Sequence, residues 1–261
     1  MPDARQPAAP DVIVTADGSR TLRSGAHGQT YKSRLGALSE SRTVYAEGSG
    51  VAARLAAGTP ASVLEIGFGT ALNFLVTSEA ARVAGTKLQY VAVESDLLSA
   101  AILRMLAHEE ALAPSPLPAA FLAWRAALED EEATREPGQA PTPRRHRWRV
   151  GPVALDLVVG NVLDDRTWAL MLPDAGRGRG AGFDAIYHDA FSPAVSPELW
   201  SSAFLARLAG VLAPGGRLVS YSVAGAVRRA LAVAGLEVRK APGPPGGKAE
   251  ALVATRPERQ P

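Results

Sequence analysis

The stretch Ser62-Val-Leu-Glu-Ile-Gly-Phe-Gly-Thr-Ala-Leu-Asn73 joins an apolar run directly to a Gly-x-Gly turn and a helical pattern. The apolar run predicts a buried strand, and the turn places two glycines where that strand ends. Glycine has no Cβ and adopts backbone angles that are closed to other residues, so a ligand can lie against the main chain here. The stretch predicts a strand, a ligand-binding loop and a helix, although a simple strand-to-helix turn would use the same residues.

Outward from this loop, strand patterns alternate with helical patterns. The expected strands cover residues 62–66, 88–94, 154–160, 183–188, 217–222, 236–240 and 250–254, and the expected helices cover residues 71–83, 97–108, 166–172, 197–212 and 224–234. This α/β alternation predicts a mostly parallel sheet of about seven strands with helices on both faces and a C-terminal antiparallel hairpin. The layout favours the Rossmann-like fold of class I S-adenosylmethionine-dependent methyltransferases.

The remaining segments are expected to surround one domain that spans residues 1–261. Two short β-type segments, residues 28–33 and 43–47, predict an N-terminal hairpin within residues 25–50 that lies over the sheet. Residues 113–145 carry prolines on both sides of an acidic helical piece, residues 121–132, and predict an insertion on a surface edge. Residues 1–10 predict a disordered tail.

The composition excludes several classes of protein. The chain has no cysteine, so disulfides, thiolate metal sites and a cysteine nucleophile are excluded. Its 4 histidines show no metal-ligand spacing, and we expect no metal. With 28 basic and 26 acidic side chains, charge alone does not require nucleic acid. No apolar run approaches the ~18 residues of a membrane helix, and the N-terminus lacks a signal-peptide core. We expect a soluble cytoplasmic protein.

The residue types at the strand ends narrow the ligand. Leu72 stands where a dinucleotide fingerprint places a small residue, which argues against NAD or FAD and suits a ligand without pyrophosphate, such as S-adenosylmethionine. Glu65 adds an acidic acceptor just before the loop. Glu94 ends the next strand and could accept both ribose hydroxyls, or could be an N-terminal acid of the following helix. Asn161 could contact the adenine edge or form an Asx turn.

Another signal follows the fourth strand, in His188-Asp-Ala-Phe-Ser-Pro193. Asp189 should point its carboxylate at the transferable group, unless it caps the following helix. Phe191 and Pro193 would give the crevice a stiff apolar wall. Adjacent residues of a strand face opposite ways, so His188 is expected to pack in the core.

Several motifs together resemble the methyltransferase domain of the MnmC family. They are Tyr31-Lys-Ser33, Thr43-Val-Tyr-Ala-Glu-Gly48, Glu65-Ile-Gly-Phe-Gly-Thr-Ala-Leu-Asn-Phe74 and Asp189-Ala-Phe-Ser-Pro193. The helix that contains Trp200 and residues 214–216 and 222–229 extend the resemblance to nearly the whole chain outside the expected insertion. The Gly-Phe-Gly-Thr-x-Leu-Asn-Phe string is its most specific part.

The resemblance implies a methyltransferase that uses S-adenosylmethionine to make the last methylation of the 5-methylaminomethyl side chain on the tRNA wobble uridine. The expected cofactor-binding residues are Glu65, Gly67, Phe68, Gly69, Thr70, Asn73, Glu94 and Asn161. Asp189 is the expected catalytic residue, and the expected substrate-binding residues are Tyr31, Glu47, Phe191, Pro193 and Lys248. Bacterial members often carry a fused FAD-dependent oxidase; this chain shows no such second domain, so FAD is not expected.

An alkyl amine has a pKa near ~10 and arrives mostly protonated. We expect Asp189 to recruit and orient this ammonium and to accept or relay its proton late, since a nearby carboxylate raises the amine's pKa.

The chain departs from the family pattern at three places. Ala71 and Ala190 replace glycines, and residues 246–250 have lost basic residues that would contact tRNA phosphates. Four arginines at 144, 145, 147 and 149 could substitute for them, or could form a solvated edge strand. A small-molecule methyltransferase, an aminopropyltransferase-like enzyme and a degenerate binding domain remain as alternatives.

Overall fold

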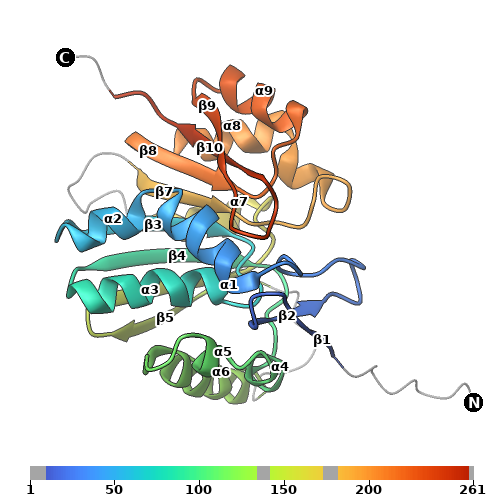
Figure 1. Cartoon of the computed structure of the whole chain (residues 1–261), viewed down its shortest axis with the longest axis vertical. Coiled ribbons are helices and arrows are strands. Elements are labelled where there is room, and N and C mark those ends of the chain that lie inside the picture. Colours follow the sequence, from blue (N-terminus) through green and yellow to red (C-terminus); the bar gives the residue numbers. More distant parts are fainter. Residues whose placement is uncertain (1–9, 134–141, 173–181, 259–261) are drawn as a thin grey trace, which may run out of the picture.

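The computed structural model describes residues 10–133, 142–172 and 182–258. Within these residues, eight strands form one sheet in the order β5-β6-β4-β3-β7-β8-β10-β9, and β1 and β2 form a separate hairpin (Figure 1). The expected tail at residues 1–10 lies outside the described residues except for its last residue. Part of the expected insertion, residues 134–141, also lies outside them.

The strands follow runs rich in β-branched and aromatic residues, which fit the pleated surface of a sheet. The hairpin comprises β1 (Asp11–Val14) and β2 (Arg20–Arg23). The sheet comprises β3 (Ala61–Ile66), β4 (Leu88–Glu94), β5 (Arg144–Val150), β6 (Val153–Val159), β7 (Phe183–His188), β8 (Leu212–Ser220), β9 (Glu237–Pro242) and β10 (Glu250–Thr255).

Five neighbouring strands, β6, β4, β3, β7 and β8, run parallel. The chain proceeds from β3 outward to β4 and β6, and later returns to the other side of β3 with β7 and β8. The direction of the winding therefore reverses between β3 and β7. Ligands of open α/β sheets bind outside the carboxyl ends of the strands at such a reversal. The glycine loop after β3 and Asp189 after β7 both lie at this point.

Helices cover both faces of the sheet (Figure 1). They are α1 (Ala37–Glu40), the π-helix η1 (Ser41–Glu47), α2 (Val51–Ala56), α3 (Leu72–Ala84), α4 (Ala100–Met105), α5 (His108–Ala111), α6 (Leu117–Ala133), α7 (Asp165–Met171), the 3-10 helix η2 (Pro197–Trp200), α8 (Ser202–Gly210) and α9 (Gly225–Val233).

Two apolar clusters hold the helices to the sheet. On one face, Phe74 of α3 packs against Tyr90 of β4 with ring centroids 5.1 Å apart. On the other face, Trp168 of α7 packs against Phe204 of α8 at 6.2 Å. Full burial of a side chain such as Phe74 contributes roughly 1.5–3 kcal/mol. The sheet is thus fixed from both sides, which gives the strand ends defined positions.

The N-terminal region differs from the expected one. The hairpin is formed by residues 11–23, upstream of residues 25–50, and residues 43–47 lie in η1 and not in a strand. Thr43, Val44 and Tyr45 have β-type side chains, which explains the expectation. Val44 and Tyr45 are buried in the same cluster as Phe74, so tertiary packing overrides the local preference.

The region expected to be an insertion contributes to the core. Its helical piece lies in α6, where Phe121 packs 5.7 Å from Phe74 and Trp124 packs 6.4 Å from Trp148. Residues 144–150 form β5, which pairs only with β6 and makes the sheet eight-stranded. The four arginines therefore lie on an edge strand of the described sheet, where Arg147 and Arg149 are exposed and Arg144 and Arg145 are half-buried.

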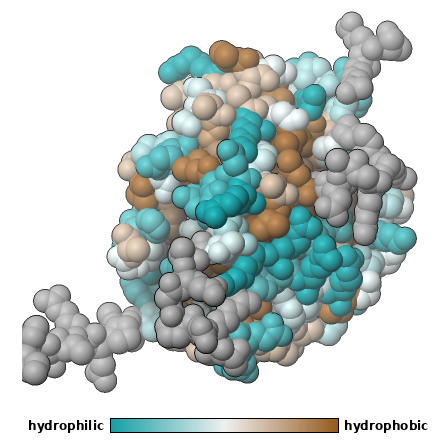
Figure 2. Space-filling model, turned by 180° about the vertical axis from the view of Figure 1, so that it is seen from behind, coloured by the Kyte–Doolittle hydropathy of each residue, from teal (hydrophilic) through white to brown (hydrophobic). Residues whose placement is uncertain are grey.

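The surface is mixed in polarity. Seen from behind, hydrophilic residues surround a band of hydrophobic ones (Figure 2). The large apolar side chains that are exposed are scattered over separate elements: Val14, Leu35, Val83, Met105, Leu163 and Val233. Among the helices of the described ranges, none combines the length and the apolar content that crossing a bilayer requires.

Candidate active site

A cavity of about 990 Å³ opens at the carboxyl ends of the parallel strands. One wall carries residues that follow β3, β4, β6 and β7, and the opposite wall comes from residues between Arg23 and Leu35 and from Glu40. Pockets for small molecules typically measure about 300–1,000 Å³. The cavity is therefore large enough for a nucleoside cofactor beside a small acceptor group.

The cavity has two chemically different parts. The loop side consists of Gly67, Phe68, Gly69, Thr70, Glu94 and Asn161, all of which line it. The network side consists of Lys32, Glu40 and Asp189, which line the cavity, together with the buried Tyr45, which is not among the lining residues and donates to Asp189.

Gly67 and Gly69 bring the main chain of the loop side against its neighbours. Gly67 has φ +86°, and a Cβ there would lie 2.8 Å from the carbonyl oxygen of Asp189. Gly69 has φ +48°, and its Cβ would lie 2.8 Å from the Tyr31 ring. A side chain would be strained at either position and would collide, so glycine is required at both. Ala71 also adopts a left-handed conformation, φ +64°, which costs a non-glycine residue about 1–2 kcal/mol.

Glu94 connects the end of β4 to the glycine loop. Its Oε2 accepts the Gly69 N–H at 3.0 Å, and its Oε1 accepts the N–H groups of Ser95 and Asp96 at 2.8 and 3.1 Å. Burial raises the pKa of Glu94, and these three backbone donors counteract that rise. The following helix α4 is capped by Ser99, so the interpretation of Glu94 as a helix N-terminal acid is wrong.

Asn161 forms the Asx turn that was one of its two interpretations, and it also lines the cavity. It lines the cavity one residue after Gly160, beyond the end of β6. Its Oδ1 also accepts the Leu163 N–H at 2.9 Å, which is an Asx turn. The turn holds the amide at the cavity wall.

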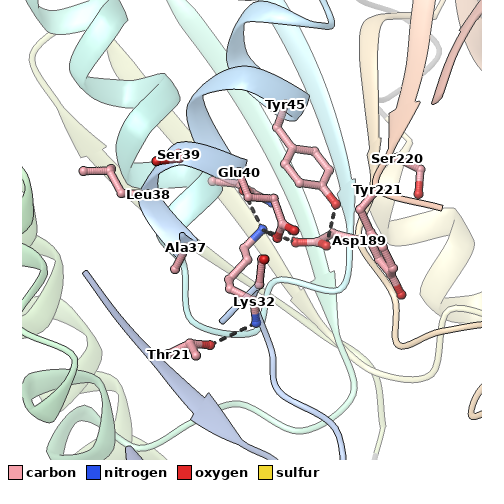
Figure 3. A network of polar contacts seen from close by, with 12 residues as sticks. Thr21, Lys32, Ala37, Leu38, Ser39, Glu40, Tyr45, Asp189, Ser220 and Tyr221 are labelled. Carbon is pink, nitrogen blue, oxygen red and sulfur yellow. Dashed lines mark hydrogen bonds and ion pairs between the residues drawn. The ribbon is translucent and has the colours of Figure 1, made fainter. Parts of the chain in front are cut away.

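Asp189 is held by three donors from different parts of the chain, of which Figure 3 labels Tyr45 and Lys32. Its Oδ1 accepts the Tyr45 hydroxyl at 2.5 Å, and its Oδ2 accepts the Asn73 amide at 2.8 Å and the Lys32 ammonium. Burial, together with Asp189 and Glu40, raises the pKa of Tyr45 well above its usual value, so the phenol remains a donor. The helix expected from Pro197 begins as η2, which has Ser196 at its N-cap position, and α8 is capped by Ser201, so Asp189 caps neither helix.

Lys32 and Glu40 were not expected at the site. The Lys32 side chain is 3% exposed, and its ammonium donates to Asn73 Oδ1 at 2.7 Å and lies 3.8 Å from Glu40 Oε1. The ammonium also lies 4.4 Å from the centre of the Tyr45 ring. Burial raises the pKa of Glu40 to about 7, with Lys32 opposing and Asp189 supporting the rise. A lysine between two carboxyl groups leaves this corner of the cavity with more acidic than basic groups.

Glu65 and Asn73 lie behind the cavity and are not among its lining residues. Glu65 shares a face of β3 with Val63, toward α3, and is 1% exposed. Its oxygens accept the Asn73 amide at 2.7 Å and the Tyr90 hydroxyl at 2.9 Å. Burial and then Asp189 raise the pKa of Glu65 to about 8. Their placement supports a role in positioning Asp189 and does not support direct cofactor contact.

Three of the expected substrate-binding residues line the cavity. The Tyr31 and Phe191 rings meet edge to face at 5.1 Å, and the Lys248 ammonium lies 4.5 Å from the centre of the Tyr221 ring. Burial, with Glu94 adding to it, raises the pKa of Tyr31 to about 12.

The other two expected substrate-binding residues do not line the cavity. Glu47 is exposed on η1, where it lies two residues beyond the buried Tyr45 and hence on the opposite side of the helix. Pro193 is half-buried, and it is not among the residues that line the cavity, although Ser192 and Ser196 are. Both expectations of direct contact are therefore unsupported by the structure.

His188 packs in the core as its strand position predicts. It is fully buried, and its ring centroid lies 4.3 Å from that of Trp200. Burial lowers the pKa of His188 to about 4, so the ring is neutral at pH 7.

Comparisons with known proteins agree with this geometry. Residues 132–257 match a family model described as S-adenosyl-L-methionine-dependent methyltransferase. A protein of Aromatoleum aromaticum, the tRNA 5-methylaminomethyl-2-thiouridine biosynthesis bifunctional protein MnmC, is 39% identical over 236 residues, which are 89% of this chain and 33% of that protein. The protein of the same name from Chromobacterium violaceum is 34% identical over 239 residues, 88% of this chain and 32% of that protein. The chain thus spans about a third of the length of these curated relatives.

The crystal structure of MNMC2 from Aquifex aeolicus has the same fold. It superposes with a TM-score of 0.68 at 23% identity, covering 99% of this chain and 75% of that one. This likeness confirms the Rossmann-like methyltransferase fold.

Proposed function

We propose that this chain, an S-adenosyl-L-methionine-dependent methyltransferase domain of the MnmC type, methylates the aminomethyl side chain of a tRNA wobble uridine to methylaminomethyl. The observation that carries the proposal is the position of Asp189. Its carboxylate lies at the cavity beside the glycine loop, and the Gly67 main chain is in close contact with the Asp189 carbonyl. A carboxylate in that position suits a cationic acceptor.

The loop side fits the cofactor. Gly67 and Gly69 have no Cβ, and the space that a Cβ would occupy stays open, so a nucleoside can lie against the main chain. Glu94 would accept the ribose hydroxyls, and Asn161 would contact the adenine edge. When bound, S-adenosylmethionine supplies a methyl group on a positively charged sulfur. The reaction is a methyl transfer and requires no FAD.

The network side fits an alkyl ammonium. Asp189 and Glu40 both line the cavity, and Lys32 is the ammonium that lies between them. Tyr31 and Phe191 would exclude water from the acceptor, because their rings close the wall next to the loop. Exclusion of water and alignment of the amine with the methyl carbon are what an in-line displacement requires.

The names of the curated relatives support tRNA as the partner, since both refer to 5-methylaminomethyl-2-thiouridine in tRNA. Lys248 at the cavity and the exposed Arg147 and Arg149 of β5 would contribute phosphate contacts. A tRNA substrate would place the reaction in the cytoplasm.

Mass spectrometry of nucleosides tests the proposal. The chain is incubated with S-adenosylmethionine and tRNA that bears 5-aminomethyluridine, and we expect one methyl group to be added to that nucleoside alone. Matched tRNA with an unmodified wobble uridine should gain none. Methylation of another nucleoside, or cofactor binding without transfer to the aminomethyl tRNA, would contradict the proposal.

A further inference from the structure

Glu40 is a buried carboxyl group at the cavity for which the reaction described so far has no role. It is the last residue of α1, it is 6% exposed, and it lines the cavity together with Asp189. The two carboxyl groups are joined only through the Lys32 ammonium, which lies 3.8 Å from Glu40 Oε1 and closer to Asp189 Oδ2. The network side of the cavity thus contains two carboxyl groups, of which Asp189 lies closer to the Lys32 ammonium than Glu40 does (Figure 3).

The oxygens of Asp189 are occupied by hydrogen-bond donors from the protein. Its oxygens already accept hydrogen bonds from Tyr45, Asn73 and Lys32. A proton on either oxygen would have to displace one of these donors, each of which is buried with it. Asp189 is therefore suited to attract and orient a cation.

We propose that Glu40 is the group that removes the proton from the acceptor amine, and this inference rests on the proposed function. A proton passes from the substrate ammonium to a Glu40 carboxylate oxygen, which frees the nitrogen lone pair. The N–C bond to the methyl group then forms as the S–C bond breaks, and the bonding electron pair stays on sulfur. The product leaves as a secondary ammonium, and the protonated Glu40 loses its proton to solvent through the cavity.

The surroundings of Glu40 support this assignment. Burial raises the pKa of Glu40 to about 7, Lys32 lowers it and Asp189 raises it; a hydrogen bond from the Ser33 backbone and then Lys248 lower it further. Tyr45 and Tyr221 are the other titratable groups that face it, and both phenols have pKa values above their usual value, so they stay neutral. A base whose pKa lies near the working pH transfers protons most effectively.

Lys32 is a positioning residue in this scheme. It accepts no proton, because an ammonium has only donors, and it holds the carboxyl groups of Asp189 and Glu40 on either side of one charge. An additional cation in the cavity then meets two carboxylates and one ammonium, so its binding is favoured.

The pH dependence of single-turnover rates for wild type and Glu40→Gln tests the assignment. With tRNA and cofactor saturating, the wild-type rate should rise through a pH near 7 and level off. The Glu40→Gln rate should be about 10²-fold lower at pH 7. It should then recover as the pH approaches the amine's own pKa near ~10, because a free amine needs no base. If Glu40→Gln keeps the wild-type rate at pH 7, or if its rate is lower than that of wild type by the same factor at every pH, the assignment is wrong.

Controls separate this inference from folding and from the proposed function. Glu110→Gln, at an exposed position of α5, should match wild type at every pH. If Glu40→Gln does not fold, Glu40→Asp replaces it in the test. The single-turnover rate of Glu40→Asp should still rise near pH 7, but to a lower plateau. A rate that rises only near the pKa of the amine would overturn the assignment. Wild type that methylates no aminomethyl tRNA contradicts the proposed function, whereas active wild type with an unchanged variant contradicts only the role of Glu40.

Discussion

The loop side and the network side of the cavity are built in different ways. The loop side consists of residues that end or closely follow β3, β4 and β6, and its shape comes from the main chain at Gly67 and Gly69. The network side joins residues that are far apart in the sequence: Lys32 and Asp189 are separated by 157 positions, and Tyr45 and Asp189 by 144. The comparison teaches that the ligand-binding shape is local to the strand ends, whereas the acceptor chemistry depends on the N-terminal segment.

Asp189→Asn should have the largest effect on the network side while it leaves the loop side intact. We expect turnover to fall by about 10³-fold or more, since the variant no longer attracts the acceptor cation and no longer pairs with Lys32. Single-turnover rates with saturating aminomethyl tRNA measure this loss. An effect below about tenfold would show that Asp189 does not face the amine.

Lys32→Met separates the network side from ordinary surface ion pairs. It leaves the Asp189 carboxylate buried without its cation, which should lower the free energy of unfolding by about 3–5 kcal/mol. Lys240→Met is the matched control, because the Lys240–Glu250 pair at 2.7 Å is exposed and should contribute less than about 1 kcal/mol. Urea unfolding measures both values, and equal losses would contradict the buried network.

Glu94→Gln tests the loop side by itself. Loss of the charged acceptor should weaken cofactor binding by about 1.5–3 kcal/mol, or roughly 10- to 100-fold in KM for S-adenosylmethionine. The turnover number at saturating cofactor should stay near that of wild type. Glu110→Gln, an exposed carboxylate, should change neither quantity. If the turnover number falls while KM for S-adenosylmethionine is unchanged, Glu94 acts in the methyl transfer and not in cofactor binding.

Glu65 gives the network side a pH-dependent stability. Its pKa is raised from 4.5 to about 8 in the fold, so its stabilising contribution is complete below pH 4.5 and is lost as the pH rises toward 8. The buried histidines His108 and His188 have pKa values lowered to about 4, and they destabilise the fold only as the pH falls below 6.5.

Between pH 7 and 8, above the raised pKa of Glu40, wild type should therefore lose stability with rising pH, by at most about 1.4 kcal/mol per pH unit from Glu65. Glu65→Gln should flatten this slope in urea unfolding, with Glu110→Gln as the control. An unchanged slope would show that Glu65 is ionised throughout this range.

The loop side could be predicted from the sequence because its signals are local. The expected strands at residues 88–94 and 183–188 have the bounds that the structure shows, since both are apolar runs with sharp polar ends. Glu94 and Asp189 follow from those ends, because the carboxyl ends of parallel strands meet at one edge. The burial of Glu65 could also be predicted, because residues two apart in a strand share a face and Val63 is apolar.

The network side could be predicted only in part. A lysine and a glutamate in an irregular N-terminal segment are usually solvated, and nothing local marks Lys32 or Glu40 as buried. The Thr43-Val44-Tyr45 pattern favours a strand, but the contacts of Tyr45 with Asp189 and Tyr187 fix it in a helix. These contacts join distant parts of the chain, so only the folded structure reveals them.

The separation of the two sides is tested most directly by one calorimetric titration with S-adenosylmethionine of wild type, Asp189→Asn and Glu94→Gln, measured side by side. We predict that Asp189→Asn binds the cofactor with the wild-type dissociation constant, within about twofold, whereas Glu94→Gln binds roughly 10- to 100-fold more weakly. Equal weakening of both variants would contradict the division of the cavity into a cofactor part and an acceptor part.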